Sequence, residues 1–146
     1  MIQEDTVRLL RECSSGITMG IDSIGDVMTS VKDGRLREVL CESREKHRTL
    51  GLETDRLLDC YRDNEKDPPM MAKGMSKLKS EFMLTMAGDE KDATVASLIT
   101  DGCNMGVKSL SKFLNEYKAA DEKSKDIAKR LIGVEEDLCR DVRRWL

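Results

Sequence analysis

Residues 4–32 read EDTVRLLRECSSGITMGIDSIGDVMTSVK, and this stretch decides the fold. Apolar residues recur in it every seven positions, at Leu10, Ile17, Ile24 and Val31. A second set of apolar or small residues, Cys13, Gly20 and Val27, follows three positions after members of the first set and widens the apolar face of the helix. This spacing is typical of a long helix that turns one face toward a bundle core, so the pattern predicts a helix over residues 4–32.

The same periodicity returns in three later segments, and it predicts helices over residues 35–63, 90–118 and 121–145. A shorter amphipathic stretch over residues 70–87 lies between the second and third long helices. Gly34 is expected just past the end of the first helix, as glycine commonly is. Because so short a turn leaves no room for a crossing, the first two helices are expected to form an antiparallel hairpin.

The composition favours an all-α protein of one domain, residues 1–146. Straight-chain helix formers dominate, whereas only 3% of the residues are aromatic. Nucleic acid is an improbable partner, because the net charge is −3 and few rings could stack on bases. The longest uncharged stretch spans about nine residues, well short of the roughly 20 that a membrane helix needs. We therefore expect a cytoplasmic protein with no membrane partner.

Cysteine usage predicts reduced thiols. The number is odd, the spacing is wide and no C-x-x-C pair occurs, so neither a disulfide framework nor a zinc knuckle is expected. The cysteines are Cys13, Cys41, Cys60, Cys103 and Cys139.

The stretch over residues 70–87 also predicts topology. A helix of this length is about 27 Å long at a rise of about 1.5 Å per residue, enough to travel back along the bundle. The second and third long helices would then run parallel, in a four-helix bundle with a short helical crossover. A five-helix up-and-down array is the alternative, and the sequence leaves both open.

Two hairpins joined by a crossover resemble the ferritin-like superfamily, and most of all a bacterial four-helix-bundle family of unknown function within it. The resemblance spans nearly the whole chain. The matching features are Leu9-Leu10 followed by Gly16 and Gly20, the run from Lys79 to Asp92, and Asp101-Gly102. It implies an antiparallel four-helix bundle whose catalytic members hold two iron ions between the helices.

The di-iron ligands of that superfamily are missing from this chain. A di-iron site takes a Glu from each of two helices and Glu-x-x-His from each of the other two. This chain has a single histidine, His47, and Arg44 stands three positions before it. We therefore predict no metal and no cofactor. Matching heights along the predicted helices places these residues at mid-bundle: Met19, Gly20, His47, Gly102, Cys103, Asp137 and Leu138.

Three interpretations of His47 stay open. It is a buried histidine hydrogen-bonded to a neighbouring helix, a remnant metal ligand together with Cys103, or the acceptor of a histidine phosphotransfer module. Gly51 four positions later favours phosphotransfer, but those modules need an exposed ring and a Lys where this chain has Leu50. The periodicity turns His47 inward, and the acidic residues are expected almost wholly outside, which leaves the histidine alone.

Paired glycines mark the same level of the bundle. Gly16 and Gly20 lie one turn apart in the first helix, as do Gly102 and Gly106 in the third. A helix-interior glycine costs about 1 kcal/mol relative to alanine, so each needs compensation. Either the helix backbones approach closely here, or the space admits a ligand.

Cys103 and Cys139 are expected near one level of the second hairpin. This raises the hypothesis of a redox or soft-metal pair. Structural thiols are favoured, since nothing nearby in the sequence would lower a thiol pKa.

The sequence as a whole favours a non-enzymatic bundle with no catalytic residues and a structural, assembly or ligand-binding role. We expect a homodimer formed through the long helices, with no particular protein partner indicated. The first alternative is a residual metal-binding or redox protein that uses His47 and Cys103. The second is phosphotransfer through His47.

Overall fold

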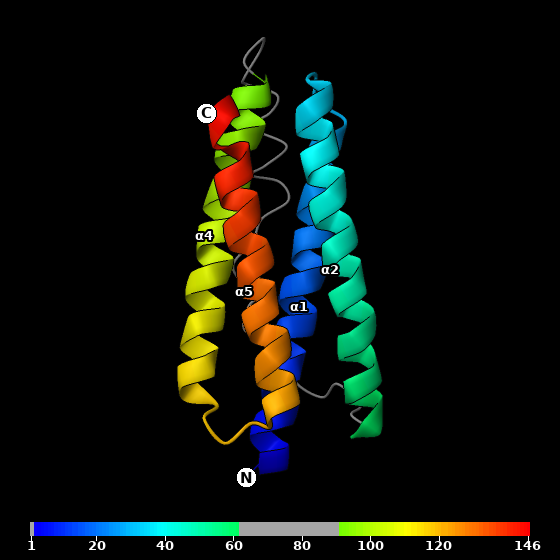
Figure 1. Cartoon of the computed structure of the whole chain (residues 1–146), viewed down its shortest axis with the longest axis vertical. Helices are drawn as coiled ribbons and strands as arrows, with labels where there is room; N and C mark the ends of the chain where they lie inside the picture. Colours follow the sequence, from blue (N-terminus) through cyan, green and yellow to red (C-terminus); the bar gives the residue numbers. More distant parts are fainter. Residues whose placement is uncertain (1, 62–90) are drawn as a thin grey trace.

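The computed structural model describes residues 2–61 and 91–146, and the regular structure in these ranges is helical throughout. Four α-helices and a terminal 3-10 turn follow one another along the chain (Figure 1). Their bounds are α1 Ile2–Met28, α2 Gly34–Cys60, α4 Lys91–Glu116, α5 Glu122–Val142 and η3 Arg143–Trp145. The predicted all-α four-helix bundle is confirmed.

The helices pack as two antiparallel hairpins, α1 with α2 and α4 with α5 (Figure 1). Helix α2 also packs on α5, and α1 contacts both α4 and α5. Because α2 and α4 run in the same direction, the chain leaves α2 at one end of the bundle and enters α4 at the other. The predicted crossover helix over residues 70–87 lies outside the described residues.

The core divides into two apolar clusters, one in each half of the bundle. The first cluster comprises Leu9, Leu10, Cys13, Ile17, Leu50, Leu110, Phe113, Tyr117, Ala120, Ile127, Ala128 and Leu131. The second comprises Ile24, Val27, Val31, Leu36, Leu40, Val95, Ala96, Ile99, Cys103, Leu138 and Val142. On α1 and α5 the boundary falls between Ile17 and Ile24 and between Leu131 and Leu138, so a separate level lies at mid-bundle.

The prediction for the first turn is wrong in its details. The first helix covers Ile2–Met28 rather than residues 4–32, and Gly34 begins α2 instead of following the end of α1. The reason is Asp33, whose Oδ1 accepts hydrogen bonds from the amides of Arg35 at 2.7 Å and Leu36 at 3.2 Å. An N-cap of this kind satisfies amides that have no partner within the helix, so it fixes the start of α2.

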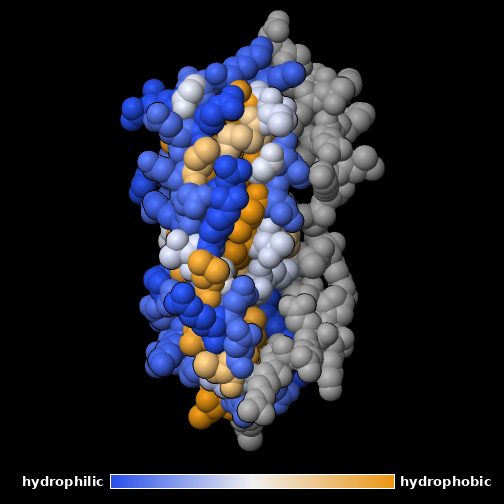
Figure 2. Space-filling model, turned by 90° about the vertical axis from the view of Figure 1, so that its right-hand side faces the viewer, coloured by the Kyte–Doolittle hydropathy of each residue, from blue (hydrophilic) through white to orange (hydrophobic). Residues whose placement is uncertain are grey.

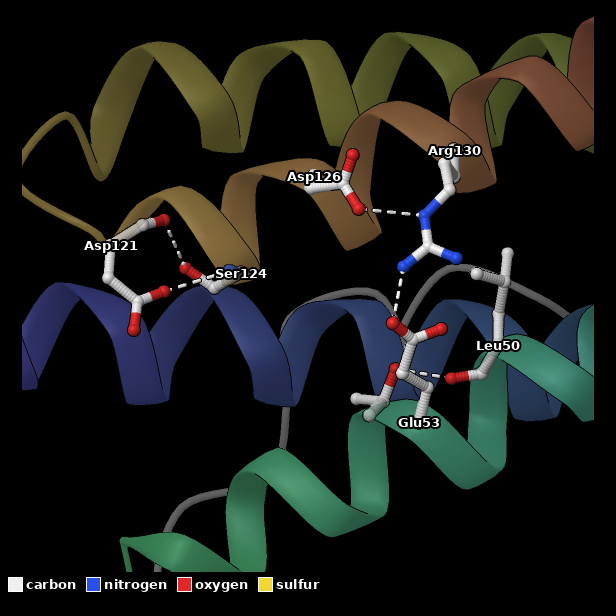
Figure 3. Close-up of polar contacts among 7 residues, drawn as sticks. Leu50, Glu53, Asp121, Ser124, Asp126 and Arg130 are labelled. Carbon is white, nitrogen blue, oxygen red and sulfur yellow. Dashed lines mark hydrogen bonds and ion pairs between the residues drawn. The ribbon is translucent and has the colours of Figure 1, made fainter.

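The other helix ends differ less from their predicted positions. Helix α2 stops at Cys60 rather than residue 63. Helix α4, Lys91–Glu116, ends two residues before the predicted 118, and its predicted start at 90 lies outside the described residues. Helix α5 begins at Glu122, one residue after the predicted 121. Asp121 is its N-cap, and its Oδ1 accepts from the Ser124 amide at 2.8 Å (Figure 3). The last helix ends at Val142, and the chain then tightens into η3.

Side chains of one hairpin hold the connecting turn of the other. Asp92 of α4 accepts from the amides of Lys32 at 2.7 Å and Asp33 at 3.0 Å, between α1 and α2. At the opposite end, the Thr6 hydroxyl of α1 accepts from the Asp121 amide at 2.8 Å. These contacts fix the relative register of the two hairpins.

Surface ion pairs add a link between α5 and α2. Arg130 donates to Glu53 Oε1 at 2.6 Å and to Asp126 Oδ2 at 2.8 Å (Figure 3). These side chains are about 40% exposed or more, so water and salt weaken the pairs and they add little stability.

The outer surface is mainly hydrophilic on the face shown in Figure 2, with a narrow hydrophobic band along the long axis. Within the described ranges, no helix combines the length and apolar character needed to cross a membrane.

A candidate ligand cavity at mid-bundle

A cavity of about 160 Å³ lies between the two core clusters and is lined by residues of all four helices. Most of its wall comes from α1 and α4, where Gly16, Gly20, Gly102 and Gly106 take part. Apolar side chains from the clusters line it as well. The polar groups that line it include His47 of α2 and Glu135 of α5.

His47 is fully buried, and both of its ring nitrogens have partners. Nδ1 lies 2.7 Å from the Ser43 carbonyl oxygen, and Nε2 lies 3.0 Å from Oε1 of Glu135. A carbonyl and an ionised carboxylate can only accept, so both bonds are satisfied when both nitrogens carry a proton. The geometry therefore suits the imidazolium form of His47.

The pKa of His47 follows from opposing effects. Burial by itself lowers this pKa, but the hydrogen bond and negative charge of Glu135, together with the Ser43 carbonyl, raise it more. The pKa therefore lies above its ordinary value of 6.5. His47 and Glu135 are hydrogen-bonded in the bundle interior and link α2 to α5; with His47 protonated, they are a buried ion pair.

Glu135 is the site residue that the sequence interpretation missed. Asp137 and Leu138 were predicted at mid-bundle on α5, and Leu138 does line the cavity. Asp137 instead faces outward and pairs with Arg140 at 3.4 Å. Glu135 lies four residues after Leu131 and three before Leu138, so the helical period already placed it on the buried stripe. The expectation that His47 stands alone is thus wrong.

Acidic residues of the described ranges lie almost wholly outside, as expected. The exceptions there are Glu12 of α1 and Glu135, which are buried.

Helix-interior glycines serve two different purposes around the cavity. A Cβ built at Gly20 would lie 2.6 Å from Nε2 of His47, so only glycine leaves room for the ring. At Gly106 a Cβ would lie 3.5 Å from Cδ of Glu135, an ordinary contact. At Gly102 a Cβ would meet no atom of the described residues within 4 Å. Close approach thus explains Gly20, while Gly102 borders space that no described atom fills.

Cys103 also lines the cavity and is buried. Burial and the negative charge of Glu135 raise the pKa of its thiol well above the ordinary 9.0. A thiol of this kind stays protonated near neutral pH, which makes it a weak nucleophile and a weak metal ligand. Cys139 is half-buried and its thiol contacts Oδ1 of Asn104 at 3.7 Å. All five cysteines are free.

The geometry bears on the two alternative roles of His47. For the metal-binding role, His47 contacts Glu135 and lines the same cavity as Cys103. The described ranges nevertheless hold no group of three or more His, Cys, Asp or Glu residues that could bind a metal ion. Phosphotransfer needs an accessible ring nitrogen, whereas Nε2 is buried and bonded to Glu135. The arrangement therefore disfavours phosphotransfer at His47.

Comparison of the chain with protein-family models, with curated proteins and with solved structures finds no match.

Proposed function

We propose that this protein is a non-enzymatic helical bundle of the ferritin-like type that binds a small molecule in the mid-bundle cavity. The observation that carries the proposal is Gly102. A helix-interior glycine costs about 1 kcal/mol relative to alanine, and no atom of residues 2–61 or 91–146 forbids a side chain at this position. Keeping the space open has a stability cost, and ligand binding would compensate for it.

The size of the cavity supports a small ligand. Its volume of about 160 Å³ is close to the roughly 150 Å³ of an engineered apolar cavity in another protein that binds benzene. A molecule with about six to eight non-hydrogen atoms therefore fits.

The ferritin-like part of the proposal has separate support. The parallel course of α2 and α4 suits a one-crossover bundle (Figure 1). In that superfamily the functional site lies between the helices at mid-height, where this chain has its cavity. Fold analogy is a weak warrant for function, so the proposed role depends on the cavity itself.

Toluene is a suitable first probe, because it matches the volume and the apolar wall. Titration followed by amide NMR should shift the resonances of Gly20, Gly102 and Gly106, and toluene should raise the melting temperature of the protein. Gly102→Leu should fill the cavity and abolish both effects. The matched control is Gly25→Leu, because Gly25 is an exposed glycine of α1, and within the described ranges no atom lies within 4 Å of a Cβ built there.

Equal binding of toluene by Gly102→Leu and by the unmodified protein would overturn the proposal, as would the absence of any response. Metal analysis of protein purified without chelators tests the non-enzymatic part separately. About two irons per chain, the content of a di-iron bundle, would contradict it.

A further inference from the structure

The cavity wall has one strong hydrogen-bond acceptor that is only partly used. Glu135 lines the cavity, and its carboxyl carbon lies 3.5 Å from a Cβ built on Gly106, another lining residue. Oε1 is bonded to Nε2 of His47 at 3.0 Å, and the carboxylate also accepts a hydrogen bond from the Cys103 thiol. A carboxylate offers about four acceptor positions on its two oxygens, and the Glu135 side chain keeps 11% of its surface exposed. Acceptor capacity therefore remains for a group in the cavity.

The charges at the site balance. Glu135 and the protonated ring of His47 form a pair with no net charge. Among the described lining residues, the remaining titratable side chain is the thiol of Cys103, whose raised pKa keeps it neutral. A ligand with a full charge would enter a mainly apolar space without a counter-ion, which is costly.

We infer that the ligand is a neutral, mainly apolar molecule about the size of a substituted benzene, with one O–H or N–H group that donates to the carboxylate of Glu135. This inference rests on the proposed function and specifies the chemistry of the same site. The apolar body replaces empty space between α1 and α4. The donor completes the hydrogen bonding of Glu135 while His47 holds the carboxylate in place.

Phenol and toluene form a matched pair of probes, because they have the same number of non-hydrogen atoms. They differ only in that phenol carries a hydroxyl group where toluene carries a methyl group. A hydrogen bond to a charged group contributes about 1.5–3 kcal/mol, so phenol should bind at least about tenfold more tightly than toluene. Calorimetry or NMR titration of the unmodified chain measures the ratio. Benzoate adds a charged probe and should bind more weakly than phenol.

The outcomes separate the two proposals. If toluene binds as tightly as phenol, or benzoate binds more tightly than phenol, the inference about the ligand is wrong while the cavity still binds a molecule. If none of the probes binds, the proposed function fails with it. These measurements use the unmodified protein and do not depend on whether any variant folds.

Glu135→Gln identifies the acceptor. The amide keeps the shape of the side chain and removes its charge, so the preference for phenol over toluene should fall to within about threefold. Far-ultraviolet circular dichroism checks that the variant is folded. Asp137→Gln is the matched control, because Asp137 lies on the same helix with its side chain 50% exposed. An unchanged preference in folded Glu135→Gln would rule out Glu135 as the acceptor.

Discussion

The buried pair of His47 and Glu135 makes the stability of the protein depend on pH. The folded-state pKa of His47 is raised above its ordinary value of 6.5. Its stabilising contribution is therefore fully present below that value and is lost as pH rises through the raised pKa. We expect the free energy of unfolding, measured by urea titration, to fall as pH increases above 6.5.

The pH range of that measurement separates the histidine from the buried thiols. Burial raises the pKa of Cys13 to about 12 and raises that of Cys103 as well, so both destabilise the fold mainly above the ordinary thiol value of 9.0. In Glu135→Gln only the effect of burial remains strong on His47, and stability should instead fall as pH drops below 6.5. The same loss of stability toward pH 8 in this variant would assign the effect to another group.

Gly20 is a second residue whose role the structure makes specific. In Gly20→Ala the new methyl group would lie 2.6 Å from the His47 ring, so the ring must move and weaken its bond to Glu135. We expect a loss of about 1–3 kcal/mol in unfolding free energy, the usual range for overpacking. Gly25→Ala on the same helix has no such neighbour and should gain about 0.5–1 kcal/mol. Equal stability of the two variants in urea would contradict this assignment.

The elements are held in register by contacts at the bundle ends. Thr6 is fully buried, and its hydroxyl accepts from the Asp121 amide at the start of α5. Thr6→Val keeps the shape and leaves that amide without its partner, which should cost about 1–3 kcal/mol.

Thr54→Val is the control for this prediction. Thr54 is equally buried, but its hydroxyl donates at 2.7 Å to the Leu50 carbonyl of its own helix, and this bond adds little stability. Urea unfolding of both variants measures the difference. A loss in Thr54→Val as large as that in Thr6→Val would show that the contact with Asp121 has no special role.

Much of each element could be predicted from periodicity, because the buried face of a helix repeats every 3.6 residues. The predicted inward position of His47 on α2 is confirmed, since its side chain is fully buried. The end of α1 was harder to predict, because Asp33 and Gly34 carry signals for both a helix end and a helix start. Only the contacts of the Asp33 carboxylate decide between them.

The candidate site was predicted in part. Matching heights along the helices brought His47, Gly20, Gly102 and Cys103 to one level, and all four line the cavity. On the last helix, height alone selected both Leu138, which lines the cavity, and Asp137, which does not, because height ignores the rotation of a side chain about the helix axis. A carboxylate on an apolar stripe contradicts simple hydrophobic patterning, and its burial depends on the histidine of another helix.

At the scale of the whole molecule, the polar side chains of His47 and Glu135 lie between the two apolar core clusters. A continuous core would bury more apolar surface, and replacing a buried ion pair by apolar residues of similar volume is often neutral or stabilising by about 1–4 kcal/mol. The pair of His47 and Glu135 is therefore not needed for folding on these grounds. Its retention fits a site that binds a ligand.

A double variant tests this view of the core. Glu135→Met alone leaves the histidine without its partner and should lose about 3–5 kcal/mol in unfolding free energy, whereas His47→Leu combined with Glu135→Met should be at least as stable as the unmodified protein. The double variant should also bind phenol no more tightly than toluene, since the acceptor is gone. Urea unfolding and the two titrations measure both effects. If the double variant is as unstable as Glu135→Met alone, the pair of His47 and Glu135 is needed for the stability of the fold itself. Its presence then gives no support to a ligand site.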